Sequence, residues 1–130
     1  MTMKKSILLL SILIVSCKPL KMNDKEKEAW ISAYKSTAFI GCLSQSFGKD
    51  FDQFLNKDQS VGANFEILYN SNMKKADSVG NNFAKSITIF PENSDFFGKK
   101  IIINNCLFFY KSKELDSIAN FEYKKMLLKK

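Results

Sequence analysis

The chain has 130 residues and a formal net charge of +7, from 20 basic and 13 acidic residues, and it contains no histidine. This length indicates one domain, and the twelve Phe and four Tyr exclude a disordered composition. All the basic residues are lysines, scattered along the chain, whereas nucleic-acid sites gather their charge in one stripe and use arginine for bidentate contacts. We therefore expect solvated surface lysines and no nucleic-acid partner. A mildly cationic face for an acidic partner is the alternative.

Residues 1–16 have the pattern of a signal peptide. Lys4 and Lys5 give the segment a positive start. Residues 7–15 then form an apolar run, broken only by Ser11, that is too short to span a bilayer. A charged start followed by a short apolar run is typical of a secretory signal, which predicts that the protein is exported.

The end of this apolar run carries a more specific motif. Ile14-Val15-Ser16-Cys17 resembles the bacterial lipobox, in which an aliphatic residue and a small residue precede an invariant cysteine. The resemblance implies that Cys17 is lipidated, that the chain is cut before it, and that residues 17–24 form a lipidated anchor and tether. Each buried lipid methylene contributes about 0.8 kcal/mol, so the anchor would hold the protein at the cell envelope, facing the periplasm. An ordinary signal peptide with an incidental cysteine is the alternative.

The three cysteines are an odd count, and a lipidated Cys17 accounts for one of them. Cys42 and Cys106 remain, in a compartment where disulfides persist. We expect them to pair, which would stabilise the fold by roughly 4 kcal/mol in the chain-entropy description. Two buried free thiols are the alternative. Without histidine, two distant cysteines are too few ligands for zinc, so the sequence predicts no metal site, and it suggests no cofactor.

The periodicity over residues 25–47 predicts a long first helix, capped by Asp24 and ended by Gly48. Apolar residues at helical spacing form one stripe along it: Ile31, Tyr34, Ala38 and Cys42, with Phe39 and Leu43 beside it. We interpret this stripe as core. Residues 50–56 are predicted to form one further helical turn.

Two more helices are predicted over residues 60–70 and 73–89, with an Asn-Ser-Asn break between them. Gly80 weakens the second of these helices by about 1 kcal/mol relative to alanine. Pro91 ends it, and residues 91–98 are predicted to form a loop.

Residues 101–110 are apolar and β-branched, and periodicity does not decide whether they form a helix or a buried strand. As a helix, they would present Ile102, Cys106 and Phe109 on one face. Ser112 would cap a last helix, and residues 123–130 would form a charged, fraying end. Residues 25–130 are therefore predicted to form an all-α, single compact domain of about four to five helices.

The sequence offers little catalytic equipment. The absence of histidine removes the commonest general base, and neither downstream cysteine has an obvious base partner. Asp50 and Asp52 form a nearby carboxylate pair, as do Glu92 and Asp95, and such pairs can perform acid–base chemistry. In polar loops, however, caps and solvated charges are far commoner. We therefore expect a protein that binds another protein rather than an enzyme.

Two segments resemble a known family. The first is Ala38-Phe39-Ile40-Gly41-Cys42-Leu43, near the end of the first helix and downstream of Trp30. The second covers residues 105–116, where Cys-Leu is followed by Tyr-x-Ser-x-Glu-Leu. Over roughly residues 25–122, the order of these features is similar to the Tai4-type immunity proteins. Those small exported helical proteins neutralise type VI secretion amidase effectors, which cut the peptide cross-links of peptidoglycan.

The resemblance implies an all-α homodimer that blocks the catalytic cleft of a cysteine amidase, with a disulfide from the first helix to the penultimate one. The candidate for effector contact is the loop of residues 91–98, with Glu92, Asp95, Phe96 and Phe97. In protein interfaces, a few buried anchor residues inside a polar rim supply most of the binding energy. The two phenylalanines of this loop suit the role of anchors, and its two acidic residues suit the rim. The alternative for the loop is that both phenylalanines pack inward as a helix entry. The alternative for function is a structural or accessory envelope lipoprotein without a toxin partner.

Overall fold

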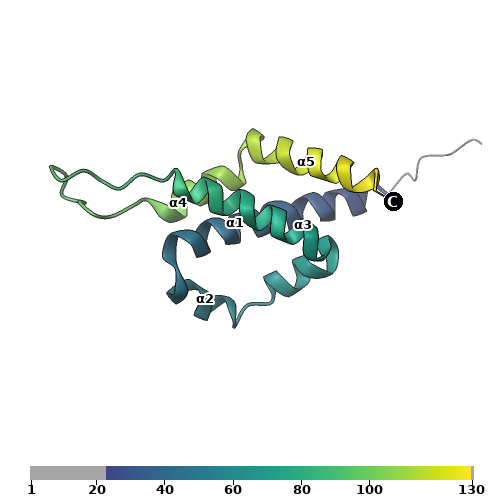
Figure 1. The fold of residues 1–130 in the computed structure, drawn as a ribbon, viewed down its shortest axis with the longest axis horizontal. Helices are drawn as coiled ribbons and strands as arrows, with labels where there is room; N and C mark the ends of the chain where they lie inside the picture. Colours follow the sequence, from purple (N-terminus) through teal and green to yellow (C-terminus); the bar gives the residue numbers. More distant parts are fainter. Residues whose placement is uncertain (1–22, 130) are drawn as a thin grey trace, which may run out of the picture.

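The computed structural model describes residues 23–129 and arranges them as five α-helices (Figure 1). In chain order they are α1 (Asp24–Phe47), α2 (Lys49–Leu55), α3 (Ser60–Lys85), α4 (Ile102–Tyr110) and α5 (Lys113–Leu127). No β-strand occurs in the part of the chain that the structure describes. The prediction of an all-α domain of four to five helices is confirmed, and the undecided segment at residues 101–110 is helical from Ile102 onward.

The predicted signal peptide, residues 1–16, lies outside the described residues, as do Cys17 and nearly all of the predicted tether. Export and lipidation therefore stay predictions. Among the described helices, none combines the length and the apolar character needed to cross a membrane.

α1 begins at a side-chain cap and ends at a glycine. The Lys25 N–H donates to the Asn23 Oδ1 at 3.3 Å, and Asp24 and Glu26 place negative charge at the positive end of the helix. The predicted cap was wrong by one position, because Asp24 is already helical. Gly48 ends the helix as predicted, with a φ of 70° that favours glycine.

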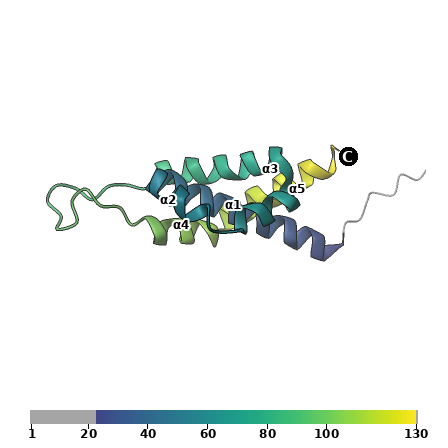
Figure 2. The same ribbon diagram turned by 90° about the horizontal axis from the view of Figure 1, so that it is seen from below.

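α1 is the central helix, in contact with α2, α3, α4 and α5 (Figure 2). Its buried residues follow helical spacing: Trp30, Ala33, Tyr34, Thr37, Ala38, Gly41, Cys42 and Leu43. The predicted stripe is thus largely the core, although Ile31 and Phe39 are only half-buried. The Trp30 ring stacks on Tyr34, with centroids 5.3 Å apart, and also meets Tyr123 at 5.4 Å.

The predicted fraying of residues 123–130 is wrong over most of that segment. α5 continues to Leu127, and Tyr123 is buried against Trp30. The physical reason is that a few apolar residues at helical spacing suffice to hold a helix that is otherwise charged. At the other end of α5, Ser112 is the predicted cap: its Oγ accepts a hydrogen bond from the Leu115 N–H at 3.1 Å.

α1 and α3 cross at close range because glycines lie at the crossing. A Cβ added to Gly80 would lie 1.9 Å from the Ala38 carbonyl oxygen, and one added to Gly41 would lie 2.8 Å from the Asp77 carbonyl oxygen. Gly80 therefore does more than weaken a helix. It allows two backbones to approach more closely than any other residue would permit.

α3 is bent at Tyr69, whose φ of 58° and ψ of 168° interrupt the helix. The predicted break at residues 70–72 is thus found one residue earlier, and the helix ends at Lys85 rather than at residue 89. The bend separates an N-terminal arm, residues 60–68, from a C-terminal arm, residues 70–85. Together with α2, the N-terminal arm forms an arch, residues 49–68, that curves beside α1 (Figure 1).

Candidate functional site

The connection between α3 and α4, residues 86–101, projects from one end of the helical bundle and is called the projecting loop below (Figures 1 and 2). Pro91 has no N–H to continue a helix, and Gly98 takes a φ of 78°. The Phe90 N–H donates to the Lys99 carbonyl at 3.0 Å and closes the loop. Further backbone hydrogen bonds fold its tip into consecutive turns.

The four predicted contact residues all lie near the tip of this loop and face solvent. Phe96 is 56% exposed, Phe97 is 58% exposed, and Glu92 and Asp95 are exposed as well. The alternative, in which both rings pack inward as a helix entry, is wrong, because both rings are more than half exposed and α4 begins only at Ile102. Phe96 instead meets Phe90 inside the loop, with ring centroids 5.5 Å apart.

The loop carries charges of both signs. Glu92 and Asp95 lie at the tip, and Lys99 and Lys100 follow on the returning segment. The ion pairs formed within residues 23–129 all lie elsewhere, on α1, α3 and α5. The tip therefore offers two carboxylates beside two exposed aromatic rings, with no lysine of the described chain paired to either acid.

Buried contacts fix the base of the loop. Ile87 lies near the start of the loop and is buried in a cluster with Leu43, Ala84, Cys42 and Cys106. The last two form the expected disulfide, with Cα atoms 5.8 Å apart and both side chains fully buried. This bond joins α1 to α4. The side chain of Ile87 therefore holds the start of the loop, and the disulfide holds the helix that follows it.

An apolar surface beside the loop was missed by the sequence interpretation. Cys106 and Phe109 are buried as expected, but Ile103, Leu107 and Phe108 on the outer side of α4 are exposed, Phe108 by 74%. We call these three residues the α4 surface. A short helix can bury only one side, and α4 has more apolar residues than one side can hold, so this excess was the available signal. Exposed apolar patches of this kind mark interaction sites.

The other carboxylate pair has a structural explanation. Asp50 and Asp52 are exposed in the first turn of α2, where negative charge suits the positive end of the helix. Residues 23–129 also hold no group of three or more His, Cys, Asp or Glu side chains arranged to bind a metal ion. The projecting loop and the α4 surface are therefore the features of this end of the molecule that need a functional explanation.

No protein-family model, curated protein or solved structure matches this chain. The resemblance to the Tai4-type immunity proteins thus stays an expectation carried by its two segments. In the structure, the first of these segments lies in α1 and the second runs from α4 into α5, and the Cys42–Cys106 bond connects them.

Proposed function

We propose that this chain is an envelope-anchored immunity protein that binds and inhibits a peptidoglycan-cleaving amidase effector of type VI secretion. The tip of the projecting loop would enter the active-site cleft. The observation that carries the proposal is the exposure of Phe96 and Phe97, beside two carboxylates, on a loop that leads into a helix joined to α1 by a disulfide. Burial of exposed rings by a partner lowers the free energy of the complex. Exposed aromatic rings on a loop therefore indicate a contact surface.

The residue types at the tip suit a narrow cleft. Phe96 and Phe97 would be the buried anchors, and Glu92 and Asp95 would lie around them as a polar rim. A cysteine amidase activates its thiol with a histidine, and the resulting imidazolium is cationic. A carboxylate from the loop would lie favourably near that charge. Blocking the cleft requires no catalysis by the inhibitor.

The fixed base of the loop also favours binding. A loop that already holds its bound shape loses less conformational entropy when a partner captures it. Ile87 and the disulfide restrict where the two ends of the projecting loop can lie. The α4 surface continues from the returning end of the loop and would widen the contact beyond the cleft.

Coexpression tests the proposal directly. The full chain would be produced together with a periplasm-directed amidase effector encoded by the neighbouring gene, and lysis and copurification would be measured. We expect protection from lysis and a stable complex. The double change Phe96→Ser and Phe97→Ser should remove protection and weaken affinity by at least about 30-fold, as for interface hot spots.

The matched control is Phe121→Ser, because Phe121 lies on α5 and is 60% exposed, much like the loop phenylalanines. This variant should protect as well as the unchanged chain. Unabated lysis with the unchanged chain, together with the absence of a complex, would contradict the proposed function. Equal loss of protection in the loop and control variants would contradict the role given to the loop.

A further inference from the structure

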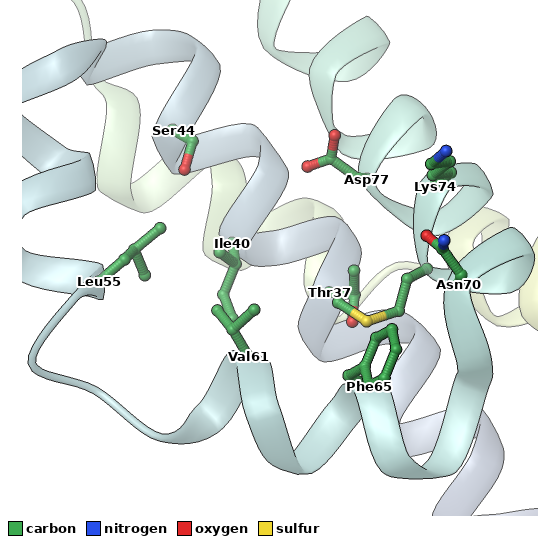
Figure 3. A pocket seen from close by; sticks show the side chains of 10 residues that line it. Thr37, Ile40, Ser44, Leu55, Val61, Phe65, Asn70, Lys74 and Asp77 are labelled. Atoms are coloured by element: carbon green, nitrogen blue, oxygen red, sulfur yellow. The ribbon is translucent and has the colours of Figure 1, made fainter.

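A pocket of about 320 Å³ lies between α1, the arch and the C-terminal arm of α3 (Figure 3). Its volume is near the lower end of the range of about 300–1,000 Å³ that small-molecule sites occupy. It lies on the arch side of α1, and its lining includes no residue of the projecting loop or of α4. Whatever it binds is therefore separate from the proposed amidase contact.

The interior of this pocket is apolar. Its apolar lining residues come from three helices: Ile40, Leu55, Val61, Phe65 and Met73. Figure 3 shows Leu55, Ile40 and Val61 gathered at one side and Phe65 at the other. Each of these side chains remains partly exposed to solvent, Phe65 by 48%. An apolar group placed between them would remove this surface from water, which is favourable.

The shape of the pocket depends on the bend in α3. Tyr69 holds a backbone conformation that is otherwise almost confined to glycine, and it directs the N-terminal arm back beside α1. Within the arch, only Asn64 and Leu68 are buried, and the Asn64 amide donates to the Ser36 hydroxyl at 3.2 Å. The buried side chains of the arch thus lie near the bend, whereas at its other end Phe51 packs partly buried against the cluster around Cys42. Residues in strained conformations persist where the surrounding structure holds them, and they cluster at binding sites.

Two opposite charges line the same pocket. Lys74 and Asp77 lie about one turn apart on the C-terminal arm, and neither forms an ion pair with another residue of the described range. The Asp77 Oδ2 accepts a hydrogen bond from the Asn81 amide at 3.0 Å, which orients the carboxylate. Ser44 and Asn70 add polar groups to the lining. A cation and an anion beside an apolar interior match a ligand that carries both charges and an apolar group.

We infer that this pocket binds a small zwitterion with an apolar side chain, namely an aliphatic or aromatic amino acid or a dipeptide of such residues. Its ammonium group pairs with Asp77, and its carboxylate pairs with Lys74. Its side chain lies among the apolar lining residues. A purely apolar ligand would leave both charges unused, and a simple anion would meet the Asp77 carboxylate unfavourably.

Calorimetric titration of the full chain tests the ligand class. The probes are leucine, methionine, phenylalanine and the dipeptide Leu-Leu, with three analogues that each lack one feature of leucine. Leucinamide lacks the carboxylate, 4-methylpentanoate lacks the ammonium group, and glycine lacks the apolar side chain. We expect binding by at least one apolar zwitterion and affinities at least about tenfold weaker for every analogue, because each leaves a charged or apolar group without its partner. No binding by any zwitterion, or equal binding by 4-methylpentanoate, overturns the inference.

Variants test the location. Asp77→Asn and Lys74→Gln should each weaken binding about tenfold, because each removes one charge partner without changing side-chain size greatly. Val61→Trp should abolish binding by filling the pocket. The control is Asp52→Asn, which removes an exposed carboxylate of α2 that does not line the pocket. Helical circular dichroism confirms that each variant is folded. Unchanged binding by folded Asp77→Asn and Lys74→Gln variants overturns the inference.

Discussion

Gly80 lies inside α3, where alanine would ordinarily form the better helix. Its contact with α1 reverses that preference, because a Cβ would lie 1.9 Å from the Ala38 carbonyl oxygen. We expect Gly80→Ala to lower the free energy of unfolding by about 1–3 kcal/mol, the usual cost of overpacking. Urea unfolding measures it.

Gly62 provides the matched control in the same helix. It is exposed, and the nearest atom to an added Cβ lies 3.5 Å away, at the end of the Gln59 side chain. Gly62→Ala should therefore raise the free energy of unfolding by up to about 1 kcal/mol, through helix propensity alone. If both substitutions stabilised the protein, α1 and α3 could not be packed as closely as described.

Tyr34 determines part of the response to alkaline pH. Burial, and secondarily the negative charge of Glu122, raises the pKa of Tyr34 from 10.0 to about 12. The folded state holds this proton more tightly than the unfolded state does. The stabilisation is therefore complete below pH 10.0 and is lost as the pH rises toward 12. We expect a loss of up to about 3 kcal/mol over that window, measured by urea unfolding on both sides of it.

Tyr34→Phe separates this effect from other alkaline titrations. The variant lacks the ionising hydroxyl, so its stability should fall less between pH 10.0 and 12 than that of the unchanged chain. Tyr123 contributes to the loss of stability in both proteins, because burial, and then the charges of Glu26 and Asp24, raise its pKa too. Parallel losses in both proteins would show that Tyr34 does not carry the effect.

The attachment of α4 depends on the Cys42–Cys106 bond. The cysteines are 64 residues apart in sequence, so the bond removes roughly 4 kcal/mol of chain entropy from the unfolded state. We expect Cys106→Ser, or reduction of the bond, to lower the free energy of unfolding by about 2–5 kcal/mol. Among the helices, α4 should show the largest increase in the rate of amide hydrogen exchange, because Phe109 would be its main remaining buried side chain.

Denaturant unfolding with and without reductant, combined with hydrogen exchange, measures both effects. The control is Cys17→Ser, because Cys17 takes no part in this bond. Reductant should destabilise the control variant and the unchanged chain equally. An unchanged free energy of unfolding after addition of reductant would show that the protein does not contain the bond.

Helix prediction succeeded where tertiary contacts agree with local pattern. α1 was found to within one residue because its apolar stripe, acidic start and terminal glycine all indicate the same helix. α4 stayed undecided because its apolar residues come in runs on either side of Asn104 and Asn105, which show neither a helical nor a strand period. Its outer face is exposed because α1 and the disulfide hold only its other side. The Asn-Ser-Asn segment indicated a break at residues 70–72, but the sequence could not place the bend at Tyr69, since a tyrosine does not favour positive φ and packing imposes it.

Of the two candidate sites, the loop could be predicted from local sequence, whereas the pocket depends on tertiary packing. Pro91 and Gly98 mark the projecting loop in the sequence, and the aromatic and acidic residues between them suggest a contact surface. The pocket was not predictable, because its lining comes from α1, α2 and two arms of a bent helix. Sequence pattern identifies which residues are apolar, whereas the meeting of distant faces depends on how the helices pack.

The molecule has two different ends. α1 begins and α5 ends at one of them, and the projecting loop extends from the other (Figures 1 and 2). α1 has 24 residues and so spans about 36 Å at 1.5 Å per residue. Under the proposed function, a lipid on Cys17 would attach near the start of α1. The loop would then be held at least that length of helix away from the attached end, where an incoming enzyme can reach it.

This arrangement predicts that anchoring and binding can be lost separately. Cys17→Ser removes the thiol that would be lipidated, so membrane fractionation should find the protein released from the membrane. Its purified form should bind the effector with unchanged affinity, because no loop residue is altered. Phe96→Ser with Phe97→Ser should do the reverse, leaving the protein in the membrane fraction while binding is lost. Membrane retention of the Cys17→Ser variant would contradict the lipid anchor, and weakened binding by that variant would contradict the separation of the two ends.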